Sequence, residues 1–105
     1  MTTSERAEHN LIMAIIEDPE CMKITAGNIS PDDFQYKTYS DIYAFCLESY
    51  ANGDPFGPDI IIQKKGDWQK VVCERSDFPV ISANIHAYIN AVLEASRLRQ
   101  IKKAA

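Results

Sequence analysis

The sequence predicts an all-α protein, a compact multi-helix bundle forming one domain over residues 1–105. Apolar residues recur at spacings of three and four in long segments near both ends of the chain, as in amphipathic helices. Between these segments, prolines, glycines and N-cap residues recur at short intervals and divide the middle of the chain into short elements. Only one run is rich enough in β-branched residues for a strand, and no second strand is present to pair with it.

The first helix is expected over residues 5–17, because its apolar residues form one broad stripe. The stripe consists of Ala7, Leu11, Ala14 and Ile15, widened by Ile12, Met13 and Ile16. It should end at residues 18–19, since the residue before a proline avoids the helical region. Pro19 is an acceptable first residue for a second, short helix that reaches about Thr25 and stops at residues 26–28.

Residues 30–33 (SPDD) predict the start of another short helix, with an N-cap serine, a proline in first position and two acids in the first turn. A longer helix is expected from about Thr38, whose spacing to Asp41 has the form of a capping box, to residues 52–53. Aromatic residues dominate this part of the expected core. The aromatic residues are Phe34, Tyr36, Tyr43, Phe45 and Tyr50, and the apolar residues Ile42, Cys46 and Leu47 accompany them.

Residues 54–58 (DPFGP) force a turn. The following run, residues 59–65, fits either a strand or a two-turn helix, and the lack of a pairing strand favours the helix. Asp67 is a candidate N-cap for a short helix that contains Trp68. This helix should end before residues 78–79. The last helix is expected from about Ser82. Its core side comprises Ile85, Tyr88, Ile89, Val92 and Leu93, and its basic end comprises Arg97, Arg99, Lys102 and Lys103.

The last helix has no stop signal before Ala105, which favours a longer parent chain over a complete short protein. The three cysteines are widely spaced and lack a CxxC pair, so we expect reduced thiols in a cytoplasmic protein. No run approaches the length of about 18 apolar residues that a membrane span needs.

Few residues suggest chemistry. The chain contains no GxxxxGK[ST] or GxGxxG loop, so ATP hydrolysis is not expected. His9 and His86 lack the spacing of a metal site, and Asp32 and Asp33 are better explained as first-turn capping residues than as an acid–base pair. We therefore expect no enzyme activity, no cofactor and no metal.

The charge is uneven. Residues 1–60 contain 11 acids and three bases, whereas residues 61–105 contain four acids and eight bases. The net charge of −4 argues against direct DNA binding by this domain. A small helical nucleic-acid-binding protein remains an alternative because of a basic patch formed by Lys64, Lys65, Arg97, Arg99, Lys102 and Lys103. This uneven distribution of charge suits docking on a charged protein surface. The alternative explanation is that the acidic and the basic face are both simply exposed to solvent and bind no partner.

Several segments together resemble the N-terminal domain of DnaB-type replicative helicases over residues 7–105. They are 7–20 (AEHNLIMAIIEDPE), 30–34 (SPDDF), 39–43 (YSDIY), 53–55 (GDP) with Asp59, and 83–99 (ANIHAYINAVLEASRLR). The chain departs from the family pattern in two places. Tyr39 replaces the usual histidine or arginine, and the stretch between Lys65 and Phe78 is short and lacks the GG-x-x-YL element.

The resemblance implies a helical bundle, with the first arm of a helical hairpin at its C-terminus and no motor domain. It also implies a non-catalytic role in DNA replication, with self-association of helicase subunits into a hexameric collar and docking of the C-terminal domain of primase. A helicase loader is a further implied partner. A stand-alone mimic from a phage or mobile element, which regulates a host helicase, is the alternative. The residues expected at partner contacts are Tyr39, Tyr50, Asn84, Tyr88, Arg97 and Arg99.

Overall fold

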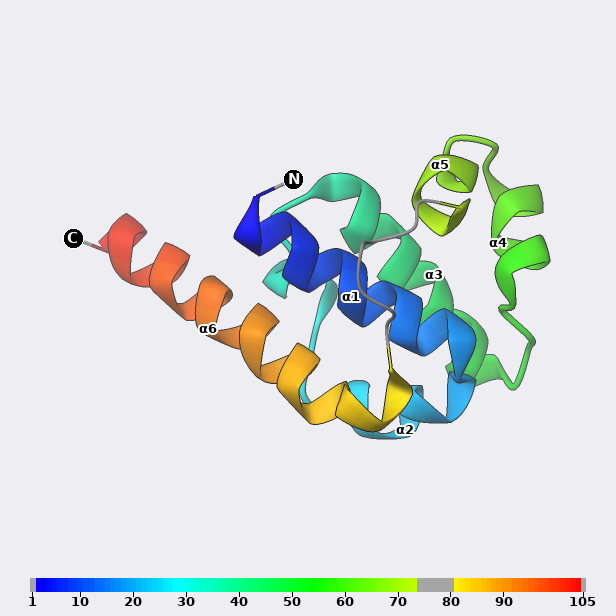
Figure 1. The fold of residues 1–105 in the computed structure, drawn as a ribbon, viewed down its shortest axis with the longest axis horizontal. Coiled ribbons are helices and arrows are strands. Elements are labelled where there is room, and N and C mark those ends of the chain that lie inside the picture. Colours follow the sequence, from blue (N-terminus) through cyan, green and yellow to red (C-terminus); the bar gives the residue numbers. More distant parts are fainter. Residues whose placement is uncertain (1, 74–80, 105) are drawn as a thin grey trace.

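The computed structural model describes residues 2–73 and 81–104, and within these residues it consists of helices joined by turns (Figure 1). The prediction of an all-α fold is confirmed. The α-helices are α1 (Thr3–Glu17), α2 (Met22–Thr25), α3 (Lys37–Asn52), α4 (Pro58–Lys64), α5 (Trp68–Cys73) and α6 (Ile85–Ala104). Short 3-10 turns, η1 (Pro19–Cys21), η2 (Pro31–Asp33) and η3 (Ser82–Asn84), precede α2, α3 and α6.

Helix α1 begins and ends where side chains replace the backbone partners that a helix terminus lacks. The Thr2 hydroxyl oxygen accepts a hydrogen bond from the Glu5 N–H at 3.1 Å, so the helix starts two residues before the predicted Glu5. At the other end, the Asp18 carboxylate accepts from the Glu20 N–H at 3.2 Å and opens η1, which leads directly into α2. The predicted second helix is therefore confirmed as a 3-10 turn followed by one α-helical turn.

The start of α3 differs from the prediction. Its first residue is Lys37, and Asp41 forms an ion pair with Lys37 at 3.5 Å, so the predicted Thr38 capping box is wrong. The N–H groups of Gln35 and Tyr36 instead donate to the carboxylate of Glu8 on α1, at 3.0–3.2 Å. The cap thus comes from another helix, and local spacing could not reveal it. Helix α3 ends as predicted at Gly53, whose φ of 75° is left-handed.

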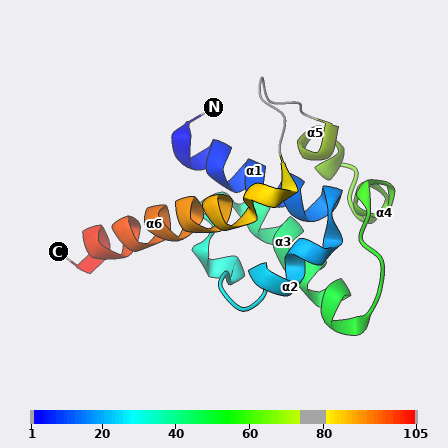
Figure 2. The ribbon, with the colours of Figure 1, turned by 60° about the horizontal axis from the view of Figure 1, so that its bottom comes forward.

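Helix α1 packs against both α3 and α6, and α4 and α5 lie together beside α3 (Figures 1 and 2). The predicted helix over residues 59–65 is confirmed as α4, whose Ile61 is fully buried. Trp68 of α5 is also buried, although the predicted end of that helix before residues 78–79 lies outside the described residues. One connected core links all six helices. It includes Leu11, Ile15, Met22, Phe34, Ile42, Tyr43, Ile61, Trp68, Ile85, Ile89 and Val92.

Helix α6 has two parts with different surroundings. In its first part Ile85, Ile89 and Val92 are buried against the body and Tyr88 and Leu93 are half-buried, which confirms the predicted core side. Its last turns extend past the N-terminal end of α1 (Figures 1 and 2). We call residues 97–104 the α6 arm. It forms one end of the long dimension of a molecule measuring 42 × 31 × 27 Å.

The three cysteines are free thiols, as predicted. Cys21 and Cys46 are buried and Cys73 is exposed. Burial raises the pKa of the Cys46 thiol to about 12. None of the helices described is both long enough and apolar enough to cross a membrane.

Candidate interaction surface

The α6 arm presents the most exposed large apolar side chains among the residues described. Leu98 is 56% exposed and Ile101 is 64% exposed, and they lie three residues apart on the same face. At 100° per residue this face is opposite the one that places Val92 and Ser96 in the body. It continues toward the start of the helix through exposed Ala91. Exposed Glu94 also lies on this face, so the exposed apolar surface of the arm is limited to Leu98 and Ile101. Leu98 lines a shallow pocket together with Ser4 and Gln35 of the body.

Polar contacts hold the base of the arm on the turn η2. The Ser96 hydroxyl donates to Asp33 Oδ1 at 2.9 Å, and Arg99 Nη2 donates to the Asp33 carbonyl oxygen at 2.7 Å. Asp33 Oδ2 also accepts from the Ser30 N–H at 2.9 Å, which supports the prediction that this acid caps the turn. Helix α6 therefore leaves the body in a fixed direction, and Arg99 is a half-buried anchor.

The buried acid Glu8 lies beside this anchor and is only 1% exposed. Burial raises the pKa of its carboxyl group above the ordinary value of 4.5. The N–H groups of Gln35 and Tyr36 and the positive charge of Arg99 act in the opposite direction and lower that pKa. Burial has the largest effect, so Glu8 takes up a proton more readily than an exposed glutamate.

A second surface feature is a groove of about 460 Å³ between α3 and the α4–α5 pair, which we call the α3–α4 groove. Phe45 and Trp68 meet in it with ring centroids 5.8 Å apart. Its lining includes three acids from the α3 side, Asp41, Glu48 and Asp54, and two bases, Lys64 and Lys65. The groove thus has charges of both signs around the half-buried ring of Phe45, whereas Trp68 is only 6% exposed.

The two lysines of the groove contact its aromatic rings. Lys64 Nζ lies 5.8 Å from the centroid of Phe45, and Lys65 Nζ lies 5.9 Å from that of Trp68. Neither Glu48 nor Asp54 forms an ion pair with another residue in the described ranges 2–73 and 81–104. Their charges are therefore available to a partner. This groove is not predicted from the sequence, although Asp41, Phe45 and Glu48 share one helical face at spacings of four and three.

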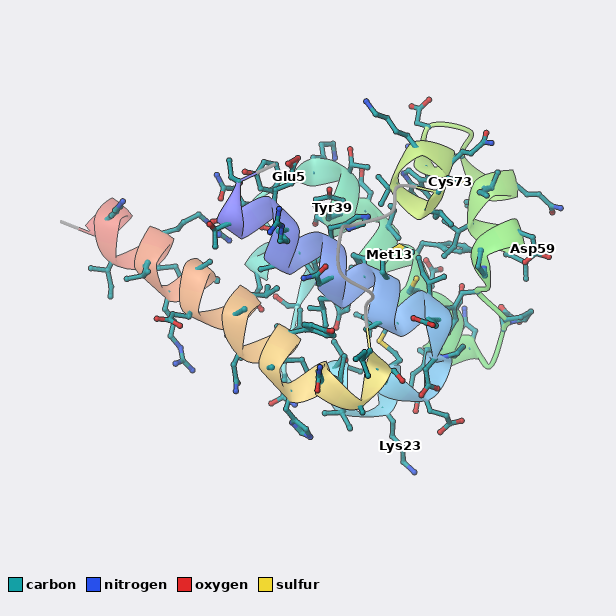
Figure 3. All side chains as sticks on the ribbon, in the orientation of Figure 1. Glu5, Met13, Lys23, Tyr39, Asp59 and Cys73 are labelled. Atoms are coloured by element: carbon teal, nitrogen blue, oxygen red, sulfur yellow. The ribbon has the colours of Figure 1, made fainter. Side chains whose placement is uncertain are left out.

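The structure places the six predicted contact residues in different parts of the molecule. Tyr39 is buried where α1 meets α3, with its ring centroid 5.9 Å from that of His9 (Figure 3). Tyr50 is 40% exposed near the end of α3. Burial makes Tyr39 a core residue in this chain, whereas Tyr50 remains accessible.

The other four lie on η3 and α6. Asn84 is exposed, and Tyr88 is half-buried with its hydroxyl oxygen accepting from the Ile81 N–H at 3.1 Å. Arg97 is exposed on the arm, whereas Arg99 is the anchor already described. Tyr88 and Arg97 are nine residues apart, or roughly 13 Å along the helix axis. The six residues are not brought together, and their role as contacts stays a prediction.

The histidines have separate surroundings. His9 is 1% exposed, and its Nε2 is hydrogen-bonded to the carbonyl oxygen of Val71 at 3.1 Å, so it links α1 to α5. His86 is exposed. In the part of the chain that the structure describes, no three or more histidine, cysteine, aspartate or glutamate residues are grouped to hold a metal ion. Exposed charges such as Lys23 and Asp59 extend into solvent at the rim (Figure 3).

These features define a small all-helical domain with a projecting last helix. The sequence model of the DnaB-like helicase N terminal domain matches residues 1–94, and the chain belongs to this family. It is thus a helicase-associated, non-catalytic type of domain, and the family implies a role in DNA replication. No curated protein and no solved structure matches the chain significantly. The match includes α1 to α5 and ends before the α6 arm.

Proposed function

We propose that this chain is a protein-interaction and oligomerisation domain of a replicative DNA helicase. In this role it self-associates as part of a hexameric collar and docks the C-terminal domain of primase, and a helicase loader is a further partner. The observation that supports the proposal is the uncovered apolar face of the α6 arm at Leu98 and Ile101.

The energetics favour association through this face. Burying one large aliphatic side chain contributes about 1.5–3 kcal/mol, so two adjacent ones form the centre of a useful contact. Amphipathic helices commonly bind by laying such a face against an apolar groove. Because Ser96 and Arg99 already fix the direction of α6, little conformational entropy remains to be lost when the arm binds.

Nucleic-acid binding is a weaker explanation of the same region. The net charge is −4, and Arg99, one member of the basic cluster at the end of α6, donates to a carbonyl oxygen of the body. A phosphate-binding surface needs several accessible cations. The geometry therefore favours a protein partner over DNA.

The test measures molar mass by light scattering across a concentration series, for the wild type and for Leu98→Ser with Ile101→Ser. We expect the wild type to self-associate and the double variant to need at least tenfold higher concentration for the same mass. Ile81→Ser is the matched control, since Ile81 is 51% exposed but lies before α6. Equal association by all three proteins would contradict the proposal.

The same experiment is repeated with the primase C-terminal domain and with intact helicase. A complex with primase supports the collar-domain function. A monomer that ignores primase but breaks up the helicase hexamer indicates the regulatory mimic instead.

A further inference from the structure

The shallow pocket at the base of the α6 arm, which we call the α1–α6 pocket, lies where α6 passes the first turn of α1 (Figures 1 and 2). Its volume is about 280 Å³. The residues that line it come from three segments of the chain, and they are Ser4, Gln35, Ala95, Leu98, Arg99 and Lys102. None of these six residues is acidic, whereas the lining of the α3–α4 groove includes three acids. The α1–α6 pocket is therefore a positively charged site on a chain whose net charge is −4.

The two cations of the pocket, Arg99 and Lys102, have no counter-ion in direct contact. Neither forms an ion pair with another residue in the ranges 2–73 and 81–104. Glu8 acts on Arg99 through its electric field alone, and the carboxylate of Asp33 accepts hydrogen bonds from other residues. Because the two cations are three residues apart on one helix, they repel each other. An anion held between them would offset this repulsion.

Arg99 is held in place and still has hydrogen-bond donors to offer. Its Nη2 donates to the Asp33 carbonyl oxygen at 2.7 Å, which fixes the guanidinium group beside the pocket. Its Nη1 is buried and has no hydrogen-bond partner among the residues that the structure describes. A buried donor without an acceptor is unfavourable. The arrangement therefore lacks an acceptor near Arg99.

The donors around the pocket indicate the kind of anion. Besides the two cations, Ser4 supplies a hydroxyl group and Gln35 supplies a side-chain amide. A carboxylate has two oxygens, whereas a phosphate group has more acceptor oxygens and carries up to two negative charges. Four donor-bearing side chains around one pocket therefore suit a phosphate group better than a carboxylate. The apolar wall of Ala95 and Leu98 leaves room for an organic group attached to the phosphate.

We propose that the α1–α6 pocket binds a phosphate group, either as inorganic phosphate or as the end of a small phosphate monoester. Duplex DNA makes a different demand, because its phosphates are spread along the backbone and need a row of accessible cations. A single phosphate group in a pocket needs only the two cations and the neutral donors around it. The pocket lies within one chain, so this proposal does not depend on the self-association proposed above.

The test is a titration with inorganic phosphate, followed by heteronuclear NMR spectroscopy at constant ionic strength and at about pH 8, where the phosphate group is mostly a dianion. We expect saturable shifts of the backbone amide signals of residues 4, 35 and 102. Lys102→Gln should weaken binding by about fivefold or more, because it removes one charged donor of the pocket. Arg97→Gln is the matched control, since Arg97 is an exposed cation of the same arm that does not line the pocket. Its affinity should stay within about twofold of the wild type, because exposed charges outside the pocket are screened.

Two further ligands separate the remaining outcomes. Acetate should bind at least about tenfold more weakly than phosphate, and equal binding would overturn the assignment of the pocket to phosphate. Tighter binding of phenyl phosphate than of inorganic phosphate identifies a monoester as the ligand, whereas equal or weaker binding identifies inorganic phosphate.

Two results would show that the proposal is wrong. One is the absence of saturable shifts in the wild type up to about 50 mM phosphate, a concentration at which even a weak specific site is occupied. The other is an equal loss of affinity in Arg97→Gln and Lys102→Gln, which indicates general attraction to a basic helix end. Both altered residues are exposed, and circular dichroism checks that the helices persist in each variant.

Discussion

At the scale of single residues, Glu8 shows how one buried side chain joins distant segments. It lies on α1, yet its carboxylate receives N–H groups from residues 35 and 36 just before α3. Arg99, near the end of α6, adds an electrostatic contribution. A charged group this deeply buried is tolerated because its oxygens are hydrogen-bonded.

Replacing Glu8 with glutamine should destabilise the chain by about 1–3 kcal/mol, because it changes a fully buried polar group that is hydrogen-bonded to the N–H groups of Gln35 and Tyr36. Burial raises the pKa of Glu8, so the wild type loses stability as the pH rises above 4.5 toward the pKa of the folded state. Glutamine lacks this titration. The difference in unfolding free energy between the two proteins should therefore be larger at pH 4 than at pH 7.

Urea unfolding at both pH values measures this difference. Glu17→Gln, an exposed change at the end of the same helix, serves as the control and should leave stability within about 0.5 kcal/mol of the wild type. A Glu8→Gln cost that grows with pH would show that ionised Glu8 stabilises the fold.

At the scale of elements, Gly53 ends α3 in a left-handed conformation with φ of 75°. Substitution by alanine should cost about 1–2 kcal/mol, because a Cβ disfavours this conformation even though no other atom lies within 4 Å of it. Gly66 offers a matched control with equal space and no positive φ, so Gly66→Ala should be neutral or slightly stabilising. Thermal unfolding measures both, and similar melting temperatures for the two variants would contradict the explanation.

The elements themselves could largely be predicted from sequence, because their signals are local. The glycine that ends α3 and the proline in the first turn of η2 act on their immediate neighbours. The start of α3 could not be predicted, since its cap comes from Glu8, 27 residues before Gln35. The spacing of Thr38 and Asp41 predicts a local capping box, whereas the structure has the tertiary contact with Glu8 at this helix start.

Surface sites were harder to predict than elements for the same reason. The burial of Tyr39 depends on the packing of α1 against α3, and the groove exists only where α4 and α5 meet α3. The apolar positions of α6 indicated its core face, but nothing in its own sequence shows where the body ends. Leu98 and Ile101 have the same spacing as core residues, and only the fold leaves them exposed.

At the scale of the whole molecule, the charge distribution predicts weak affinity for DNA. With a net charge of −4, we expect no binding to a 20-base-pair duplex in fluorescence anisotropy at 50 mM salt and micromolar protein. The arm variant with Arg97→Glu and Lys102→Glu is the control. If the wild type binds and this variant does not, with affinity falling steeply as salt rises, the arm would be a nucleic-acid surface.

Helix α6 continues without a break from the part packed on the core into the arm, so the order of the arm depends on a folded core. Ile85, Ile89 and Val92 hold the helix on the core, so a copy with an unfolded core has no ordered arm to offer its neighbour. If copies associate through the arm as proposed, only folded copies join the assembly, and association removes them from the folding equilibrium. The melting temperature should then rise with protein concentration, because association stabilises only the folded state.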